Sequence, residues 1–306
     1  MFFLTSELRA EKLAVPPGTQ ATLDKIYAFD LTGAIADAQR LQAEEPGHPL
    51  GYLLEAEARW WKIWCGAAEF KYGMTFAQRR PKQAADDHYI ELATTALANA
   101  ESQLKQHDSA EMHLYAGMAQ AALARLYGLR GENRAAARAG VKAREQFQRA
   151  LQLNPQLADA DFGLGLYNYY ADTLSAFVKL LSFFMGIPGG DKHDGIRQLE
   201  RAINEGQLTP SAARFYLALN LHRYDLQYEQ ALAVIGPLVE KYPTNPLFQL
   251  ARGDLYGKLG RTEQALACYR AAAALAAHDE TCRAHLEELV RVSLAAHGVS
   301  ETPPSH

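Results

Sequence analysis

The sequence is poor in the residues that β-strands prefer. Its 306 residues include only 8 Val and 8 Ile, against 53 Ala and 41 Leu. Because β-branched side chains favour strands whereas Ala and Leu favour helices, this ratio argues against a β or α/β architecture, and with it against the doubly wound folds that bind dinucleotides. Hydrophobic residues at 48% and charged residues at 22% are typical of a folded chain, not of a disordered one.

Positive charge and long apolar segments are also scarce. The chain carries 31 Lys and Arg against 35 Asp and Glu, which gives a net charge of -4. Proteins that bind duplex nucleic acid usually present a basic surface, so we expect no nucleic-acid partner. No run of about 18 apolar residues occurs, and therefore no helix is expected to span a membrane.

Cysteine is rare, with only Cys65, Cys268 and Cys282 in the chain. An odd and sparse set predicts no disulfide framework and fits a reducing compartment. The first residues, from Met1 to Glu7, lack the basic flank and the apolar core of a signal peptide. We therefore expect a cytoplasmic protein, or a periplasmic one if a leader has been removed or replaced.

An internal repeat dominates the sequence. In the segment 246–275, small and aromatic residues alternate around the turn Leu259-Gly260-Arg261, and Ala231 lies 34 residues before Ala265. Small residues let two helices approach closely, and aromatic residues fill the gaps between successive helix pairs. The pattern is carried by Gly253, Tyr256, Ala265, Tyr269 and Ala272, by Ala231 and Pro243, by Ala143, Phe147, Ala150 and Pro155, and by Ala34, Leu41 and Pro46.

This pattern resembles the tetratricopeptide-repeat (TPR) family from about residue 19 to residue 277. The resemblance implies an all-α fold, a right-handed α-α superhelix in which helix pairs stack because none can bury its apolar face alone. We expect one solenoid over residues 19–297, after an N-terminal extension at 1–18 and before a flexible tail at 298–306. Helix pairs are expected at about 19–46, 48–107, 109–155, 156–205, 209–243 and 246–277, with a capping helix at about 279–297.

The fourth pair carries about 20 extra residues, at about 172–190. The stretch 174–187 is mostly apolar, with Lys179 as its only charge and with the spacing of an amphipathic helix. We expect it to pack on its own solenoid as a helical hairpin; a protein partner or a lipid surface is the alternative. The flanking segments Gly165-Leu166-Tyr167-Asn168 and Gly189-Gly190-Asp191 make the chain look like a bacterial relative of the eukaryotic TPR family of mitochondrial outer-membrane and inclusion-body-clearance proteins.

No complete catalytic or cofactor-binding motif is present. Gly163-Leu164-Gly165 lacks the third glycine and the preceding strand of a dinucleotide fingerprint, so we interpret it as helix packing. Asp191 stands where a phosphate loop needs glycine and is expected to be a helix N-cap. Two groups have metal-ligand residue types without a closed ligand set: His278, Cys282 and His285, and Asp191, His193 and Asp194. We therefore expect no enzyme, no cofactor and no metal.

All three tryptophans, Trp60, Trp61 and Trp64, lie within five residues of one another. In a helix rich in Ala we expect them to fill the core between two long helices at about 50–70 and 83–106, the alternative being an exposed aromatic platform. A joint from Met74 to Pro81 connects these helices. The basic residues around it, Lys71, Arg79, Arg80 and Lys82, are expected in a solvated loop.

The binding site is expected in the concave groove, which the first helices of a TPR superhelix line. Tyr, Arg and Asn suit a peptide, because they offer large contact areas and hydrogen bonds to a backbone. The 34-residue register places these side chains in the groove: Phe162, Tyr169, Tyr170, Tyr216, Asn220, Arg223, Tyr224, Asp254 and Lys258. Some TPR domains clamp a C-terminal carboxylate with Lys, Asn and Arg. Asn220 matches one such position, but Tyr216 replaces the lysine and Ala251 the next asparagine, so this clamp is not supported.

We therefore predict a non-enzymatic protein–protein interaction scaffold that binds a peptide or protein segment in its concave groove. The first alternative is a membrane-surface adaptor that uses the apolar segment 174–187, and the second is a metal-binding or enzymatic protein. The expected partner is a protein or a peptide, and a second copy of the chain is a further option because the same apolar segment could pair with itself.

Overall fold

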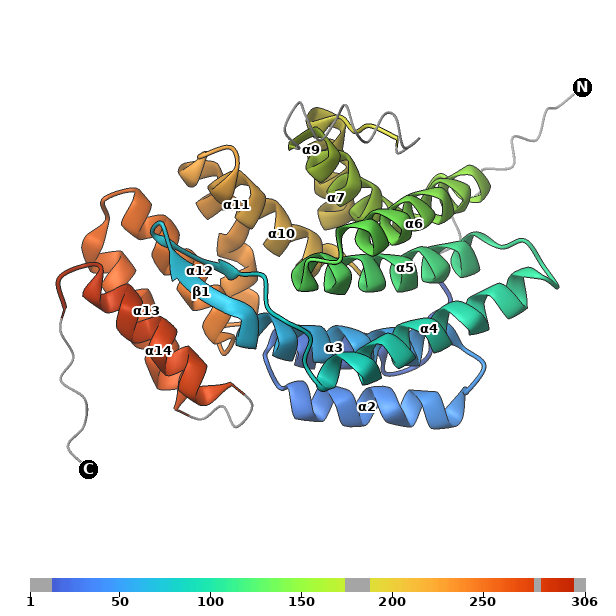
Figure 1. Ribbon diagram of the computed structural model, residues 1–306, viewed down its shortest axis with the longest axis horizontal. Helices are drawn as coiled ribbons and strands as arrows, with labels where there is room; N and C mark the ends of the chain where they lie inside the picture. The colour runs from blue at the N-terminus through green and yellow to red at the C-terminus, as the bar shows by residue number, and fades with distance from the viewer. Residues whose placement is uncertain (1–12, 174–187, 278–281, 300–306) are drawn as a thin grey trace, which may run out of the picture.

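The computed structural model describes residues 13–173, 188–277 and 282–299. Within these ranges the chain forms thirteen helices and one β-hairpin (Figure 1). The helices are α1 (Thr19–Tyr27), α2 (Leu31–Glu44), α3 (Pro49–Ala67), α4 (Ala85–Leu104), α5 (Ala110–Arg130), α6 (Asn133–Leu153), α7 (Asp159–Thr173), α9 (Lys192–Glu205), α10 (Pro210–Arg223), α11 (Tyr228–Lys241), α12 (Pro246–Lys258), α13 (Thr262–Ala276) and α14 (Arg283–Ala295). The apolar insertion expected at 174–187 lies outside the described residues.

The helices form a two-layered array. Each helix packs against the next along the chain, and α1, α3, α5, α7 and α10 also pack in succession against one another. These first helices of the pairs form the inner layer, while α2, α4, α6, α9 and α11 form the outer layer (Figure 1). The all-α helical repeat predicted from the sequence is confirmed. Within the described residues, no helix is both long and apolar enough to cross a bilayer.

Local sequence signals set the helix ends. The Ser109 and Asn245 side chains accept hydrogen bonds from first-turn amides of α5 and α12, and Asp191 caps α9 by accepting from the Asp194 amide at 3.0 Å, as expected. Gly131 ends α5 in the left-handed region, with φ of 81°. These caps satisfy amide groups that a helix cannot bond internally.

Small residues let the paired helices touch. A Cβ atom added to Gly165 of α7 would lie 2.9 Å from the Gly195 carbonyl oxygen of α9, and one added to Gly253 of α12 would lie 2.6 Å from the Tyr269 ring. Gly163 lies directly against Phe147 of α6. The interpretation of Gly163-Leu164-Gly165 as helix packing is therefore correct.

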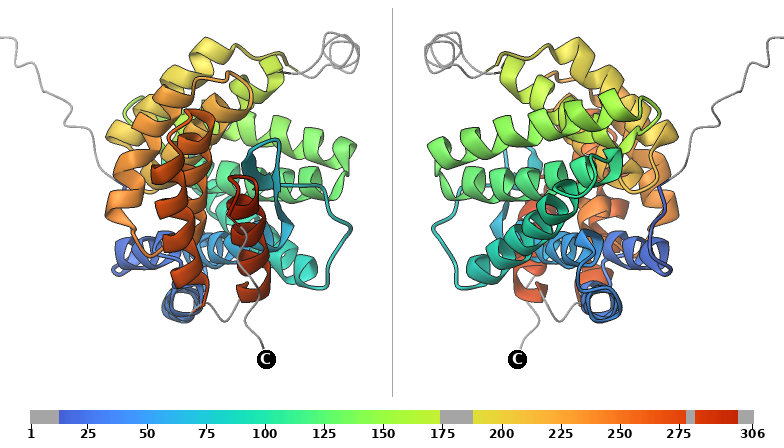
Figure 2. Two further views of the ribbon diagram at one scale, coloured as in Figure 1. Left: turned by 90° about the vertical axis from the view of Figure 1, so that its left-hand side faces the viewer. Right: turned by 90° about the vertical axis from the view of Figure 1, so that its right-hand side faces the viewer.

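The first pair lies against the fifth and sixth pairs, so the array closes on itself (Figure 2). The Asn245 side-chain amide donates to the Tyr27 carbonyl at 2.9 Å, and the Tyr242 hydroxyl donates to Asp24 at 2.7 Å. The Thr244 hydroxyl donates to the Ala28 carbonyl at 2.8 Å. We call this contact the seam.

The three tryptophans of α3 fill the centre of the closed array. Trp60, Trp61 and Trp64 are all buried. The Trp61 ring packs against Phe215 of α10 at 4.9 Å and Phe248 of α12 at 5.5 Å, measured between ring centroids. The prediction that the tryptophans form core is confirmed, and they pack on helices distant in sequence, as well as on the neighbouring α4 through Tyr89.

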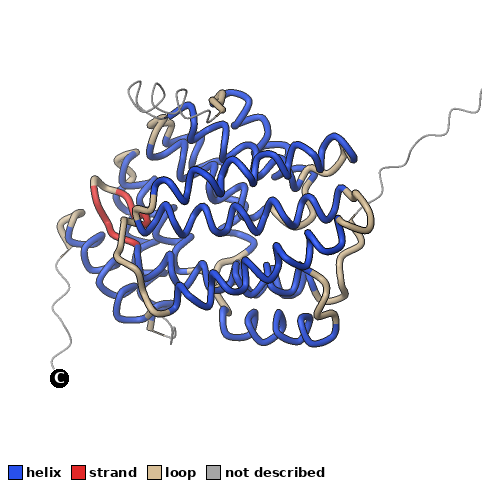
Figure 3. The backbone as a smooth tube through the Cα atoms, turned by 45° about the vertical axis from the view of Figure 1, so that its right-hand side comes forward, coloured by secondary structure: helices blue, strands red, loops and turns tan. Residues whose placement is uncertain are grey.

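The expected joint between the two long helices is a β-hairpin. Strands β1 (Ala68–Lys71) and β2 (Met74–Ala77) pair antiparallel, with Lys71 opposite Met74 (Figure 3). Tyr72 and Gly73 both have positive φ, of 56° and 73°, as in the tightest hairpin turns. The hairpin contacts α3, α12 and α14. Two of the basic residues expected in a solvated loop are paired here, Arg80 with Glu69 and Lys82 with Asp87, both at 2.6 Å.

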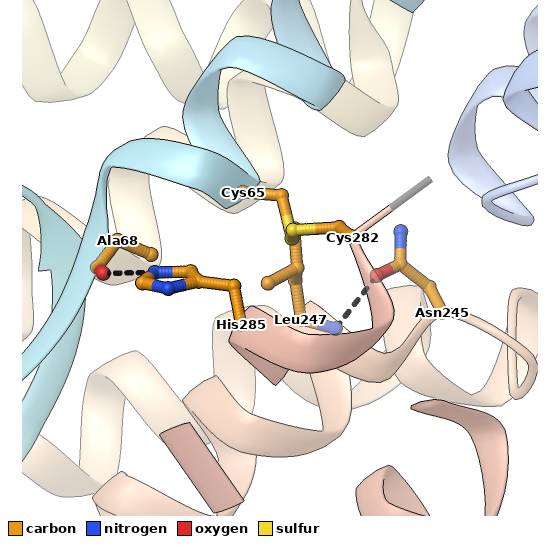
Figure 4. Close-up of a disulfide and its surroundings, with 6 residues drawn as sticks. All are labelled: Cys65, Ala68, Asn245, Leu247, Cys282 and His285. Atoms are coloured by element: carbon orange, nitrogen blue, oxygen red, sulfur yellow. Dashed lines mark hydrogen bonds between the residues drawn. A yellow bond between two sulfur atoms is a disulfide. The ribbon is translucent and has the colours of Figure 1, made fainter. Parts of the chain in front are cut away.

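The cysteine prediction was wrong. Cys65 and Cys282, 217 residues apart, form a disulfide between the last turn of α3 and the start of α14 (Figure 4). Cys268 is free and buried. Cysteine number and spacing gave no sign of this bond because it depends on closure of the array, which brings the last helix beside the central one. The argument for a reducing compartment therefore loses its basis.

Candidate peptide-binding surface

Seven of the nine predicted groove residues lie on two neighbouring inner helices. Phe162, Tyr169 and Tyr170 come from α7, and Tyr216, Asn220, Arg223 and Tyr224 come from α10 and its C-cap. The other two, Asp254 and Lys258, lie on α12 and contact the β-hairpin. The structure thus separates the predicted residues into two groups.

Three tyrosine rings form the centre of the first group. Tyr169, Tyr170 and Tyr224 lie with ring centroids 6.0–6.2 Å apart, two of the three pairs edge to face. Tyr169 is fully buried, and its hydroxyl donates to Asp225 at 2.8 Å. Tyr170 and Tyr224 are 37% and 43% exposed. Tyr169 therefore supports two rings that face solvent.

Asn220 lies beneath these rings. Its side-chain oxygen accepts a hydrogen bond from the Tyr170 hydroxyl at 3.1 Å, while its side-chain amide nitrogen has no partner among the described residues. The side chain is only 2% exposed. A buried donor without an acceptor costs about 1–3 kcal/mol, so such groups are rare in folded proteins. Asn220 thus holds an unused hydrogen-bond donor directly below an exposed aromatic side chain.

Arg223 borders the tyrosines. Its guanidinium lies 4.0 Å from the centre of the Phe76 ring and 5.3 Å from that of Tyr224. The side chain is exposed and has no carboxylate partner in the described part of the chain. Stacking on aromatic rings holds the planar guanidinium in place while its N–H groups stay available. We call Tyr170, Asn220, Arg223 and Tyr224, with Phe76 beneath, the aromatic surface.

Tyr216 is already engaged within the protein. Its hydroxyl accepts a hydrogen bond from the Trp60 indole at 2.9 Å, and its ring packs near Phe162. Next to it, Arg125 pairs with Glu57 at 2.6 Å and stacks over Trp60 at 4.5 Å. Removal from water raises the pKa of the Tyr216 hydroxyl. This region stabilises the inner layer and is not part of the aromatic surface.

Asp254 and Lys258 hold the β-hairpin. Asp254 is 1% exposed and accepts hydrogen bonds from the Thr75 amide at 2.5 Å and the Tyr269 hydroxyl at 3.0 Å. Removal from water raises the pKa of this carboxyl to about 7. Lys258 donates to the Tyr72 carbonyl at 2.5 Å. Asp254 and Lys258 were predicted to line an open groove, but the β-hairpin covers them. The hairpin itself was not predicted from the sequence.

Residues 248–279 match the family model for the tetratricopeptide repeat. This segment is similar to one tetratricopeptide repeat. Solved structures similar to the chain are the C-terminal part of a TPR repeat-containing protein from Cytophaga hutchinsonii (14% identity, TM-score 0.36, 85% of this chain and 79% of that one) and a tetratricopeptide repeat protein from Parabacteroides merdae (16%, 0.35, 94% and 95%). The search of curated proteins found no match.

The matched repeat consists of most of α12 and all of α13. Its small residues are those that the spacing singled out: Gly253 faces the Tyr269 ring, and Ala265 and Ala272 are fully buried. The resemblance to the TPR family is confirmed. The relationship to the eukaryotic mitochondrial family stays a prediction.

The two candidate metal groups are used in other ways. Cys282 is in the disulfide, and the His285 imidazole bonds the Ala68 carbonyl at 2.6 Å, while His278 lies outside the described residues. Asp191 caps α9, and Asp194 pairs with Arg197. In the ranges the structure covers, no three metal-ligand side chains come together.

Proposed function

We propose that the chain is a non-enzymatic protein-binding scaffold whose aromatic surface binds an extended peptide segment. Tetratricopeptide repeats generally mediate protein–protein interactions. The observation that carries the proposal is the unpaired Asn220 amide beneath the exposed Tyr170 ring. Such a donor is costly in the free protein and is satisfied by an arriving carbonyl oxygen.

The chemistry of the surface suits a peptide with an acidic side chain. Tyr170 and Tyr224 supply broad, rigid contact area at small cost in conformational entropy, which is typical of binding hot spots. Arg223 adds a cation that has no carboxylate partner in the described part of the chain. A peptide that places a backbone carbonyl at Asn220 and a carboxylate at Arg223 satisfies both groups. For the Asn220 amide to reach a ligand, the Tyr170 side chain must turn aside, because the amide is buried beneath it.

The test is a selection from a random peptide library on the wild-type protein, followed by calorimetry on the enriched peptides. We expect Asn220→Ala and Arg223→Ala each to weaken binding at least tenfold, which corresponds to about 1.4 kcal/mol. Arg197→Ala is the matched control, since Arg197 is an exposed arginine on neighbouring α9 that pairs with Asp194. Unchanged affinity in both site variants, or an equal loss in the control, contradicts the proposed site.

The same variants separate binding from stability. Asn220→Ala removes an unsatisfied donor together with its hydrogen-bonded oxygen, so the free energy of unfolding should change by no more than about 1 kcal/mol. A structural residue at this buried position would instead show a loss of stability in step with the loss of affinity. Urea denaturation of both proteins decides between these outcomes.

A further inference from the structure

We propose that the Cys65–Cys282 disulfide is a redox-sensitive clasp. When intact, it holds the last helix and the β-hairpin in the closed array; when reduced by a dithiol, it releases both and loosens the Phe76 side of the aromatic surface. The effect on peptide binding rests on the proposed function, whereas the release of α14 and the hairpin does not.

The Cys65–Cys282 disulfide joins two elements that are distant in the chain. Cys65 lies in the last turn of the central helix α3, and Cys282 is the residue directly before α14. The disulfide lies beside Leu247 and Asn245 at the start of α12, next to the seam (Figure 4). One covalent bond thus joins the centre of the array to its final helix at the place where the array closes.

Helix α14 is held by packing as well as by the disulfide. It is the last helix that the structure describes, and it packs against α13, α12, α3 and β1. Its apolar face is buried through Leu286, Leu289, Val290 and Leu294, but the buried Ser293 hydroxyl has no partner among the described residues. The disulfide directly before its first turn adds a covalent attachment to this packing.

The β-hairpin connects the clasp to the aromatic surface. Strand β1 starts three residues after Cys65, and His285 lies three residues after Cys282. The two short arms meet where the His285 imidazole donates to the Ala68 carbonyl at 2.6 Å (Figure 4). Strand β2 then places Phe76 beneath Arg223. Reduction of the disulfide is therefore expected to affect the position of Arg223 through the β1–β2 pair and Phe76.

The chemistry is an ordinary thiol–disulfide exchange. A thiolate of the external dithiol attacks one sulfur of the bond and forms a mixed disulfide, and the second thiol of the reductant displaces the cysteine. Cys65 and Cys282 gain two electrons and two protons, and the dithiol becomes a cyclic disulfide. Cys282 is 8% exposed whereas Cys65 is fully buried, so attack is expected at the Cys282 sulfur.

The experiment compares the oxidised chain, the chain reduced with dithiothreitol, and the variant Cys65→Ser/Cys282→Ser. Alkylation of the unfolded oxidised protein should label one thiol, that of Cys268; labelling of three thiols would show that the bond does not form and would overturn the proposal.

Hydrogen exchange of folded protein is then followed by mass spectrometry in three segments: 68–77, 283–295 and, as internal reference, α5. We expect exchange at least tenfold faster in the first two segments, in both the reduced and the serine forms, with α5 unchanged. Cys268→Ser is the matched control and should behave as the oxidised wild type.

Two further outcomes decide the coupling to the aromatic surface. A peptide selected on the oxidised protein should bind the reduced form at least threefold more weakly. Equal exchange in oxidised and reduced protein overturns the clasp, and changed exchange with unchanged peptide affinity overturns its link to the surface. If the library yields no binding peptide, the proposed function fails while the exchange data still decide the clasp.

Discussion

At the scale of single residues, two buried polar side chains on inner helices behave in opposite ways. Asp254 is surrounded by donors, the Thr75 amide and the Tyr269 hydroxyl, and it fixes the hairpin. Asn220 is equally buried, but its amide nitrogen has no partner among the residues that the structure describes. A satisfied group contributes to the fold, whereas an unsatisfied one costs stability that a ligand can recover. This difference fits a structural role for Asp254 and supports the binding role that we propose for Asn220.

Asp254 makes the stability of the fold depend on pH. Its pKa rises from 3.8 in the unfolded chain to about 7 in the folded protein because burial disfavours the carboxylate. Between these values the folded state binds more protons than the unfolded state. The stabilising contribution from protonation of Asp254 is therefore fully present below about pH 4 and is lost as the pH rises through 7. The loss is at most about 1.4 kcal/mol per pH unit.

We therefore expect the wild type to lose up to about 2–3 kcal/mol relative to Asp254→Asn between pH 5 and pH 8, measured by urea denaturation. The asparagine keeps an acceptor for the Thr75 amide and cannot ionise. Asp87→Asn, at an exposed site on α4, serves as the control and should follow the wild-type curve. Parallel curves for wild type and Asp254→Asn would show that Asp254 is charged at all these pH values.

The residues of the aromatic surface were predictable in part. The repeat register alone places Tyr170, Asn220, Arg223 and Tyr224 on inner helices, since those positions follow from the 34-residue period. Phe76 was not predictable, because its strand reaches Arg223 from about 150 residues away in the chain. Nor could the register show that Asp254 is covered, because the cover belongs to another repeat.

At the scale of elements, the space around each glycine shows which helix faces are in contact. In α7, a Cβ atom on Gly165 would lie 2.8 Å from the Leu199 side chain and 2.9 Å from the Gly195 carbonyl. In α6, a Cβ atom on Gly140 would meet nothing within 4 Å. The two positions are both helical and differ only in what packs on them.

The pair gives a matched stability test by urea denaturation. Gly165→Ala should destabilise the fold by about 1–3 kcal/mol, because the backbone of α9 must move away. Gly140→Ala should stabilise it by about 0.5–1 kcal/mol, because alanine loses less backbone entropy in a helix. Equal effects of the two substitutions would mean that α7 and α9 do not approach as closely as described.

Helices were easier to foresee than the hairpin for a physical reason. The helix signal is spread over many turns of small and apolar residues, whereas the hairpin depends on four-residue strands and on Tyr72 and Gly73. The tyrosine at a positive φ is uncommon and gives no turn signal of the Asn-Gly kind. The strands are held from outside, by Asp254 and α14, and such support is invisible in local sequence.

At the scale of the whole molecule, closure distinguishes this chain from an open repeat array. In an open array each repeat contacts only its neighbours, so stability is a sum of local terms. Here the first pair contacts the fifth and sixth through the seam, and the central Trp61 touches α1, α10 and α12. Periodicity predicts the repeat unit but not how many units complete a circle, which explains why the disulfide was not foreseen.

Asn245 allows the seam to be tested without loss of a helix cap. Its side-chain oxygen accepts from the Leu247 and Phe248 amides and caps α12, while its amide nitrogen donates to the Tyr27 carbonyl across the seam. Asn245→Asp keeps the cap, because a carboxylate accepts the same bonds, but it removes the donor and places an acceptor opposite a carbonyl. The variant thus changes the seam alone.

We expect Asn245→Asp to lower the free energy of unfolding by about 2–4 kcal/mol, since a buried carbonyl loses its partner and a carboxylate is buried beside it. Thr244→Val removes a neighbouring seam bond at an exposed position and should cost less than about 1 kcal/mol. If closure makes the array cooperative, the urea transition of Asn245→Asp should also broaden, with a lower m value, because the two ends of the array then unfold separately. A variant as stable and as cooperative as the wild type would mean that the two ends of the array do not depend on each other, and that the tryptophan core alone keeps the circle closed.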